Sequence, residues 1–391
     1  MAKTYADLLQ EVKAAIRQVS LEDLKDRLDS GEELILVDVR EKDEWRQGHV
    51  PGALHIPRGF LEMQSGSRLP DKNATIVTIC AAGIRSAFAA KVLLELGYTN
   101  VESANPGFNQ WKDQGFPTTQ PFAFTDAQLN RYSRHLLLPE VGEQGQAKLL
   151  QGRVLLLGAG GLGSPAALYL AAAGVGTIGI VDGDTVDESN LQRQVLHGLD
   201  RVGESKVESG KRTIENLNPD VKVIPFNERL TRQNVDRIFD QDWDVIVDGL
   251  DNFATRYLVN DASVWKDIPV VHGSIFRFEG MVSVFHPLEG PTYRDMVPEP
   301  PPAELAPSCA EAGVLGVLPG IIGSIQALET IKVILGLGDP LIGRILTVDT
   351  TDMEFRVFNL KANPDNPVVH ANADRIEIKE LDGLCAPGLT G

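Results

Sequence analysis

The stretch Val154-Leu155-Leu156-Leu157-Gly158-Ala159-Gly160-Gly161-Leu162-Gly163-Ser164-Pro165 decides the fold of most of this chain. Its apolar run predicts a buried parallel strand, its glycines predict a tight turn, and Ser164 and Pro165 predict the N-cap and first turn of a helix that ends near Ala173. Glycine lets the backbone approach a phosphate, and a helix N-terminus offers unpaired N–H groups and partial positive charge. The pattern therefore predicts a nucleotide site in an α/β domain.

An acidic residue follows the next predicted strand. Residues 177–181 are apolar and lead into Asp182, which lies 19 residues after Gly163. At about this spacing an acidic side chain meets a ribose hydroxyl in dinucleotide-binding folds. An NAD-dependent oxidoreductase shares this fingerprint, so the glycine turn alone leaves that class of enzyme open.

Charged residues further along the chain favour an adenylating enzyme. Arg193 and Lys206 supply more positive charge than a bound diphosphate needs. They suit a reaction in which negative charge builds on a transferring phosphoryl group and pyrophosphate leaves. Asp248 and Asp251 follow the apolar run 245–247, and open α/β sheets bind ligands beyond the carboxyl ends of their strands. Because Mg²⁺ takes one or two carboxylates together with substrate phosphates, Asp251 is our candidate Mg²⁺ ligand.

The order of these motifs resembles the MoeB/ThiF family over residues 125–391. Members of this family look like the catalytic core of ubiquitin-activating enzymes and activate the C-terminal glycine of small ubiquitin-like sulfur carriers. The matching motifs are Arg131-Tyr132-Ser133-Arg134, the glycine turn, Asp182-Gly183-Asp184, Ser189-Asn190-Leu191-Gln192-Arg193-Gln194, Lys206, Asp251-Asn252-Phe253-Ala254-Thr255-Arg256 and Ser308-Cys309-Ala310-Glu311-Ala312-Gly313.

This resemblance implies a set of ATP-binding residues, namely Gly158, Gly160, Gly161, Gly163, Asp182, Asn190, Arg193, Lys206, Asp251 and Asn252. It also implies a homodimer in which Arg134 reaches into the partner subunit's site. Without the resemblance, Asp251 and Asn252 could simply cap a helix, and Arg134 could be a surface arginine on an amphipathic helix.

A cysteine marks a second unit near the N-terminus. The apolar run 75–79 leads into Cys80-Ala81-Ala82-Gly83-Ile84-Arg85, and Ser86 is expected to open an apolar helix. N–H groups at a helix N-terminus and a nearby arginine stabilise a thiolate over a thiol. We therefore expect Cys80 to be nucleophilic and Arg85 to hold an anionic sulfur donor. The alternative is that Cys80 is a small buried hydrophobe.

The Cys-x-x-Gly-x-Arg loop resembles the active-site loop of single-domain rhodaneses. Matches at Asp38-Val39-Arg40, 48–53 and 107–111 extend the resemblance over about 18–118, with Asp38 and Arg40 expected to form a structural ion pair. The expected fold is a small rhodanese-like α/β domain followed by a Rossmann-like adenylating domain with a mixed β-sheet. The expected boundaries are an N-terminal extension 1–19, the rhodanese-like domain 20–118, a linker 119–124 and the adenylating domain 125–391.

A third candidate residue follows a proline-rich run. The prolines exclude a regular helix or a central strand over residues 297–304, so we expect Cys309 to lie on an exposed, mobile loop. There its thiol could form a thioester with an activated carboxyl group or a disulfide with Cys80. Many MoeB-like proteins hold a structural zinc ion with two Cys-x-x-Cys pairs. Because the chain has three cysteines, a tetrathiolate site is impossible and no zinc is predicted. The aligned positions hold Thr292, Asp295, Asn366 and Val369.

Composition restricts the partners and the compartment. A net charge of −17 argues against nucleic acid or an anionic membrane as the main partner. Three cysteines cannot build a disulfide framework, the N-terminus has no apolar signal core, and the apolar stretch 312–323 is too short to span a membrane. We therefore expect a cytoplasmic protein.

Together these features predict a two-step enzyme. ATP and Mg²⁺ would adenylate the C-terminal Gly-Gly of a ubiquitin-like carrier, with Arg193 and Lys206 stabilising the phosphates. A persulfide on Cys80, charged by thiosulfate or a cysteine-desulfurase persulfide, would then give a thiocarboxylate. One alternative is an activating enzyme for a peptide or a tRNA base, with the rhodanese-like unit as a docking module, and another is a non-catalytic scaffold that binds carriers. Carriers of the molybdopterin, thiamine and cysteine pathways all fit the resemblance.

Overall fold

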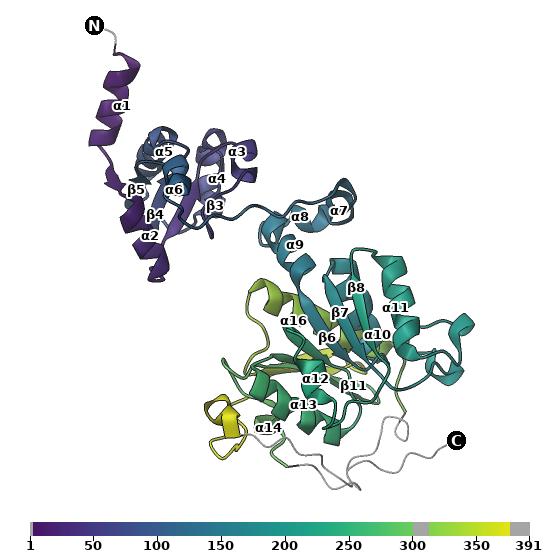
Figure 1. The fold of residues 1–391 in the computed structure, drawn as a ribbon. Helices are drawn as coiled ribbons and strands as arrows, with labels where there is room; N and C mark the ends of the chain where they lie inside the picture. Colours follow the sequence, from purple (N-terminus) through teal and green to yellow (C-terminus); the bar gives the residue numbers. More distant parts are fainter. Residues whose placement is uncertain (1–2, 300–312, 376–391) are drawn as a thin grey trace. The chain divides into compact units, whose positions relative to one another are not determined.

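The computed structural model describes residues 3–299 and 313–375 of the 391-residue chain. The chain divides into two compact units, Met1–Ala123 and Phe124–Gly391 (Figure 1).

The first unit is built on a five-stranded, wholly parallel sheet in the order β1-β5-β4-β2-β3. Its elements are α1 (Tyr5–Ala14), β1 (Arg17–Val19), α2 (Leu21–Asp29), β2 (Ile35–Asp38), α3 (Lys42–Arg46), β3 (Leu54–His55), η1 (Arg58–Phe60), α4 (Leu61–Arg68), β4 (Thr75–Ile79), α5 (Ile84–Glu95), β5 (Asn100–Ala104) and α6 (Phe108–Asp113).

Both faces of this sheet are covered, because successive strand side chains point to opposite sides. Val77 of β4 packs with residues of α2, α3 and α6, whereas its neighbour Ile76 packs with residues of α4 and α5. The edge strand β1 comes from the segment expected to be an N-terminal extension, and it pairs in parallel with β5. The first sheet therefore recruits residues that precede the expected rhodanese-like domain, 20–118.

The second unit is built on an eight-stranded mixed sheet in the order β13-β12-β11-β10-β9-β6-β7-β8. Its helices are α7 (Asp126–Arg131), α8 (Ser133–Leu136), α9 (Gly142–Gln151), α10 (Gly163–Ala173), η2 (Glu188–Asn190), η3 (Leu199–Arg201), α11 (Lys206–Leu217), α12 (Val235–Phe239), α13 (Phe253–Lys266), α14 (Tyr293–Met296), α16 (Val317–Leu335) and η5 (His370–Arg375). Its strands are β6 (Arg153–Leu157), β7 (Thr177–Val181), β8 (Lys222–Phe226), β9 (Val245–Asp248), β10 (Val270–Phe276), β11 (Glu279–Phe285), β12 (Arg344–Asp349) and β13 (Glu354–Asn359).

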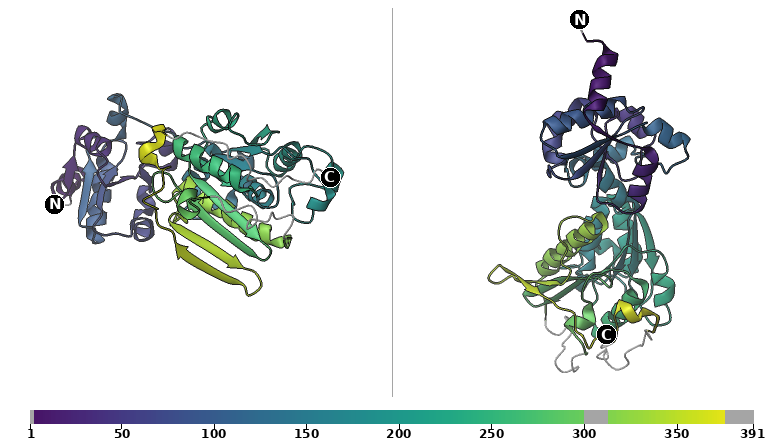
Figure 2. Two further views of the ribbon diagram at one scale, coloured as in Figure 1. Left: turned by 90° about the horizontal axis from the view of Figure 1, so that it is seen from below. Right: turned by 90° about the vertical axis from the view of Figure 1, so that its left-hand side faces the viewer.

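The sheet is parallel from β8 to β10 and antiparallel from β10 to β13, with β12 and β13 forming a hairpin at its edge (Figure 2). Side chains of α10, α11 and α16 pack on one face of β6 and β7, and side chains of α12 and α13 pack on the other. By length and composition alone α16 could cross a membrane, but in this unit it packs against α10, β10 and β11. The Rossmann-like, mixed-sheet architecture expected from the sequence is confirmed.

Two helices begin earlier than the sequence predicted. The N-cap of α10 is Leu162, and Ser164 lies inside its first turn, so the prediction that Ser164 caps this helix was wrong. The glycine turn itself supplies the first helical turn, since the Ser164 N–H already donates to the Gly160 carbonyl at 2.9 Å. Similarly, α5 begins after Gly83, and the Ser86 hydroxyl instead accepts hydrogen bonds from Cys80 and Ser103.

Candidate functional site

The second sheet reverses its winding direction between β6 and β9. From β6 the chain moves outward to β7 and β8, then returns to the opposite side of β6 as β9. Since α10 covers one face of the sheet and α13 covers the other, the turns after β6 and β9 lie together at the carboxyl ends of the strands, where sheets of this kind bind ligands. The two turns touch: the Gly249 N–H donates to the Leu157 carbonyl at 3.0 Å.

The glycine turn after β6 has no room for side chains at its two ends. A Cβ on Gly163 would lie 1.9 Å from the Gly158 carbonyl oxygen, and Gly158 has φ +96°. A Cβ on Gly161 would lie 3.3 Å from Pro319, whereas Gly160 has more space. The backbone of the turn is therefore the surface available to a phosphate group.

Asp182 lies against this turn. One of its carboxylate oxygens accepts the Ala159 N–H at 2.8 Å, and the other accepts the Asp184 N–H at the same distance. The structure thus brings the expected ribose ligand next to the expected phosphate cradle.

The two expected phosphate-binding cations come from consecutive segments after β7. Arg193 donates to the side chain of Asn190 at 2.9 Å, and its Cδ lies 3.6 Å from the position of a Cβ on Gly161. Lys206 is the first residue of α11, is 6% exposed, and its Nζ donates to Asp184 at 3.0 Å. Arg193 therefore lies at the turn, while Lys206 is held by an aspartate.

Asp184 and His197 belong to the site, although sequence reasoning gave neither a role. Burial alone would raise the pKa of Asp184, but the hydrogen bond from Lys206 and the charges of Lys206 and Arg229 lower it below its ordinary value. His197 connects the glycine turn to α11, because its Nε2 lies 2.8 Å from the Ala159 carbonyl and its Nδ1 lies 2.9 Å from the Ser209 hydroxyl. The Asp182-Gly183-Asp184 motif was the available signal for Asp184.

Asp251 and Asn252 lie in the turn between β9 and α13. The Asn252 side chain caps α13 by accepting the Thr255 N–H at 2.9 Å. Asp251 is exposed, and it has no hydrogen-bond or ion-pair partner among residues 3–299 and 313–375. Its carboxylate is thus available for a ligand, and Mg²⁺ binding there stays a prediction.

Two other expected site residues have no contacts that test their roles. Arg134 is exposed on the short helix α8. Cys309 lies outside the described residues. Their proposed roles in the partner's site and in sulfur chemistry stay predictions.

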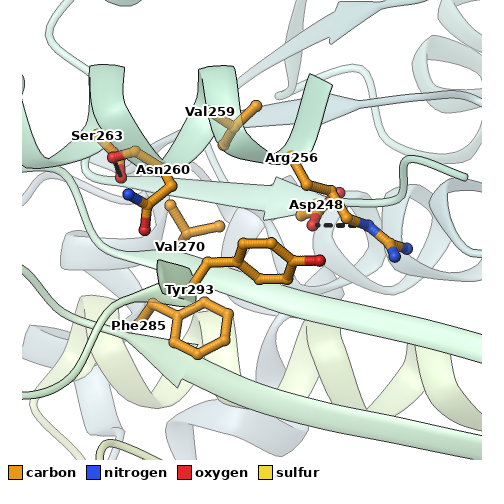
Figure 3. Close-up of a pocket in the computed structure, with 8 residues that line it drawn as sticks. All are labelled: Asp248, Arg256, Val259, Asn260, Ser263, Val270, Phe285 and Tyr293. Atoms are coloured by element: carbon orange, nitrogen blue, oxygen red, sulfur yellow. Dashed lines mark hydrogen bonds and ion pairs between the residues drawn. The ribbon is translucent and has the colours of Figure 1, made fainter. Parts of the chain in front are cut away.

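A pocket beside the β9 turn contains a buried charged network (Figure 3). The Asp248 carboxylate accepts a hydrogen bond from His272 Nδ1 at 2.7 Å and from the Leu250 N–H at 2.9 Å, and it lies 3.7 Å from Arg256 Nε. Burial alone would raise the pKa of Asp248, but the hydrogen bond from His272 and the charge of Arg256 lower it. The pocket is lined by Asp248, Arg256, Val259, Asn260, Ser263, Val270, Phe285 and Tyr293.

In the first unit, Cys80 lies between β4 and α5, as expected. Its side chain is 1% exposed, and its Sγ lies 3.4 Å from the Ser86 hydroxyl. Its carbonyl accepts the Phe108 N–H at 2.7 Å, which fixes the loop against α6. The buried position agrees with the alternative of a small buried hydrophobe, whereas the loop geometry agrees with a nucleophile.

Arg85 has an acidic partner that the sequence did not indicate. Its guanidinium donates two hydrogen bonds to Glu44, at 2.7 and 2.6 Å. The pair lowers the pKa of Glu44 to about 2, mainly through the hydrogen bond from Arg85. No local pattern links positions 44 and 85. Nearby, Asp38 and Arg40 form the expected buried ion pair, at 2.7 Å.

Three of the four positions aligned with zinc ligands, Thr292, Asp295 and Asn366, are joined by hydrogen bonds. Asn366 donates to the Thr292 hydroxyl at 3.1 Å and to Asp295 at 3.0 Å, while Asp295 also accepts the Asn363 N–H at 2.8 Å. No group of three or more metal-ligating side chains occurs in the described part of the chain. The absence of zinc stays a prediction.

Comparisons with known proteins agree with this architecture. A model of the ThiF family matches residues 132–368, and a model of the rhodanese-like domain matches residues 20–114. The probable adenylyltransferase/sulfurtransferase MoeZ of Mycobacterium tuberculosis is 50% identical over 275 residues, which cover 69% of each chain. The SAMP-activating enzyme E1 of Haloferax volcanii is 48% identical over 263 residues, covering 67% of this chain and 97% of that protein.

A solved structure shows the same fold. E. coli MccB aligns with a TM-score of 0.54 at 22% identity, covering 62% of this chain and 75% of that one. The chain therefore belongs to the ThiF family and carries a rhodanese-like domain ahead of its ThiF region.

Proposed function

We propose that this protein uses ATP to adenylate the C-terminal glycine of a ubiquitin-like sulfur carrier, and then transfers sulfur from Cys80 to form a thiocarboxylate. The observation that carries the proposal is the glycine turn after β6, which lies against the β9 turn and has Asp182 and Arg193 beside it. The names of the relatives support it, since MoeZ is called an adenylyltransferase/sulfurtransferase and a Thermus thermophilus relative is called a sulfur carrier protein adenylyltransferase.

The residues at and beside the glycine turn have the chemistry that each part of ATP needs. The glycine turn offers N–H groups to the phosphates, Asp182 offers oxygen atoms to the ribose, and Arg193 and Lys206 offer positive charge. Mg²⁺ held by Asp251 would supply Lewis-acid stabilisation of the phosphate oxygens. We propose that these groups bind and orient the triphosphate beside the carrier's C-terminus.

The first step makes the carrier carboxylate electrophilic. A carboxylate oxygen attacks the α-phosphorus, a new P–O bond forms, and the bond to the β-phosphate bridge breaks. Pyrophosphate leaves with its charge compensated by Arg193 and Lys206, and the carrier becomes an acyl-adenylate. For its Nζ to reach a phosphate, Lys206 exchanges the carboxylate of Asp184 for a phosphate oxygen.

The second step transfers sulfur. A persulfide on Cys80, charged by thiosulfate or a cysteine-desulfurase persulfide, attacks the acyl carbon through its outer sulfur, and AMP leaves. A second thiol, the role we propose for Cys309, then attacks the Cys80 sulfur. This cleavage releases the thiocarboxylate and leaves a disulfide for an external thiol to reduce. Joining both units in one chain raises the effective concentration of the persulfide to about millimolar.

ATP–pyrophosphate exchange tests this function. We expect exchange that depends on a carrier ending in Gly-Gly, and Cys80→Ala should leave exchange intact while abolishing thiocarboxylate formation, as seen by mass spectrometry. Cys385→Ala is the matched control. Exchange that proceeds equally well without a carrier would contradict the proposal that the carrier is the substrate of adenylation. Normal thiocarboxylate formation by Cys80→Ala would instead favour a docking role for the rhodanese-like unit.

The assembly and compartment belong to the same proposal. We expect a cytoplasmic homodimer in which Arg134 completes the partner's ATP site, with no zinc, nucleic acid or membrane involved. Mixing Arg134→Ala chains with chains inactivated at another ATP-site residue should restore part of the exchange activity if the sites are shared.

A further inference from the structure

Hydrogen bonds hold the backbone of Gly249 and Leu250, the two residues that precede Asp251 and Asn252 in the turn after β9. The Gly249 N–H donates to the carbonyl of Leu157, and the Leu250 N–H donates to Asp248 at 2.9 Å. The Leu250 carbonyl accepts Arg256 Nη2 at 2.6 Å. Within residues 3–299 and 313–375, Asp251 is therefore an unpartnered side chain on a fixed backbone.

Arg256 and Asp248 hold the two backbone polar groups of one residue, Leu250. Figure 3 shows the two side chains adjacent, and their charged atoms are 3.7 Å apart. Asp248 takes the N–H of Leu250, and Arg256 donates to its carbonyl while also lying 3.4 Å from the Gly273 carbonyl. Three elements, β9, α13 and β10, therefore meet at this one turn.

The network around Asp248 and Arg256 is buried, and neighbouring elements hold it by hydrogen bonds. The side chains of Asp248 and Arg256 are 3% and 10% exposed. His272 donates to the second oxygen of Asp248, and Gln326 of α16 donates to its backbone carbonyl at 2.8 Å. Since a buried ion pair loses in desolvation much of what it gains in attraction, its main effect here is to select one conformation of the turn.

We propose that Arg256 and Asp248 are positioning residues, which hold the 249–252 turn in the conformation that presents Asp251 to Mg²⁺ and ATP. The inference rests on the proposed function for its ligand. Its structural part, the ordering of the turn by two buried side chains, can be measured without any ligand.

The first experiment compares amide hydrogen exchange of residues 249–252 in two variants without nucleotide or metal. Arg256→Lys keeps a positive charge but lacks the guanidinium, whose Nη2 donates to two carbonyls while its Nε faces Asp248. Arg294→Lys is the control, because Arg294 forms a similar pair with Asp261 on α13, at 2.6 and 2.8 Å, without a contact to the turn. We expect exchange in 249–252 to rise about tenfold in Arg256→Lys alone.

The second experiment measures the Mg²⁺ concentration that gives half-maximal ATP–pyrophosphate exchange. Residues that orient a metal ligand typically contribute about 10- to 100-fold to metal affinity or activity, so we expect a shift of that size in Arg256→Lys. The KM for the carrier should stay unchanged. Asp248→Asn, which keeps an oxygen for the Leu250 N–H, provides the same comparison if Arg256→Lys fails to fold.

Two results would overturn the inference: wild-type exchange of residues 249–252 in Arg256→Lys, or equal Mg²⁺ shifts in Arg256→Lys and Arg294→Lys. If the wild-type protein shows no carrier-dependent activity, the proposed function fails, whereas the amide exchange result still decides whether Arg256 orders the turn.

Discussion

Arg85 donates two hydrogen bonds from its guanidinium to the carboxylate of Glu44, although the two residues lie 41 positions apart in the sequence. The sequence predicts that Arg85 holds an anionic sulfur donor, and such a donor would have to compete with Glu44 for the guanidinium.

Replacing Glu44 should strengthen donor binding. We expect Glu44→Gln to lower the KM for thiosulfate several-fold, because the neutral amide leaves the guanidinium charge uncompensated. Since the folded-state pKa of Glu44 is about 2, the carboxylate is ionised at every pH above about 4, and the difference should stay constant from pH 5 to 8. Steady-state cyanide-dependent sulfurtransferase assays measure it. Glu62→Gln, which breaks an exposed pair with Arg58, is the control, and an equal effect there would contradict the prediction.

Lys206 should matter for turnover rather than for folding. Lys206→Met keeps the length of the side chain and removes its charge, so we expect the rate of ATP–pyrophosphate exchange to fall about 10²- to 10³-fold. The control is Lys211→Met on the same helix, where the lysine is half-exposed and lies 4.0 Å from Glu215. A similar loss in both variants would indicate disturbance of α11 instead of loss of a phosphate contact.

The glycine turn should tolerate a methyl group at one position and not at another. Gly163→Ala places a Cβ 1.9 Å from a carbonyl oxygen, and we expect it to destabilise the second unit by about 3 kcal/mol or more. Gly160→Ala meets its nearest atom at 3.6 Å and should change stability by less than about 1 kcal/mol. Thermal denaturation compares them, and equal midpoints would refute the geometry of the turn.

Acid should weaken the second unit partly through His197. Burial lowers the pKa of this imidazole below 6.5. As the pH falls through 6.5 the unfolded chain takes up the proton first, so the stabilisation present above that pH is lost on acidification. His197→Gln should flatten the decline in unfolding free energy between pH 7 and 5, and the half-exposed His370→Gln should not. If the unfolding free energy of His197→Gln declines between pH 7 and 5 as steeply as that of the wild type, other titrating groups cause the decline and the prediction is wrong.

The polar cluster of Thr292, Asp295 and Asn366 should stabilise its region without metal. Asp295→Ala removes one of the two acceptors of the buried Asn366 amide and the acceptor of the Asn363 N–H, and it should destabilise the unit by about 1–3 kcal/mol. A chelator should leave the wild-type thermal midpoint unchanged. Asp365→Ala, an exposed neighbour, is the control. Stoichiometric zinc in the purified protein would refute the expectation.

Local sequence patterns were enough to predict the helices and strands that glycine residues bound clearly. The apolar run before Gly158 and the glycine at 174, which closes α10 with φ +85°, define a strand, a turn and a helix from neighbouring residues alone. The start of α10 was placed wrongly at Ser164, because the hydrogen bond from the Ser164 N–H to the Gly160 carbonyl already winds the glycine turn into the helix. Likewise, β1 has three residues and exists only because β5 lies beside it.

Hydrophobic periodicity, turn residues and motif order act over short distances, so the two α/β units, the glycine cradle and the charged residues could be predicted from the chain alone. The charged residues that meet are known from the folded structure: Glu44 with Arg85, Asp184 with Lys206, and Asp248 with Arg256. Such pairs join residues on different elements, and their geometry depends on how strands and helices pack, which no local pattern encodes.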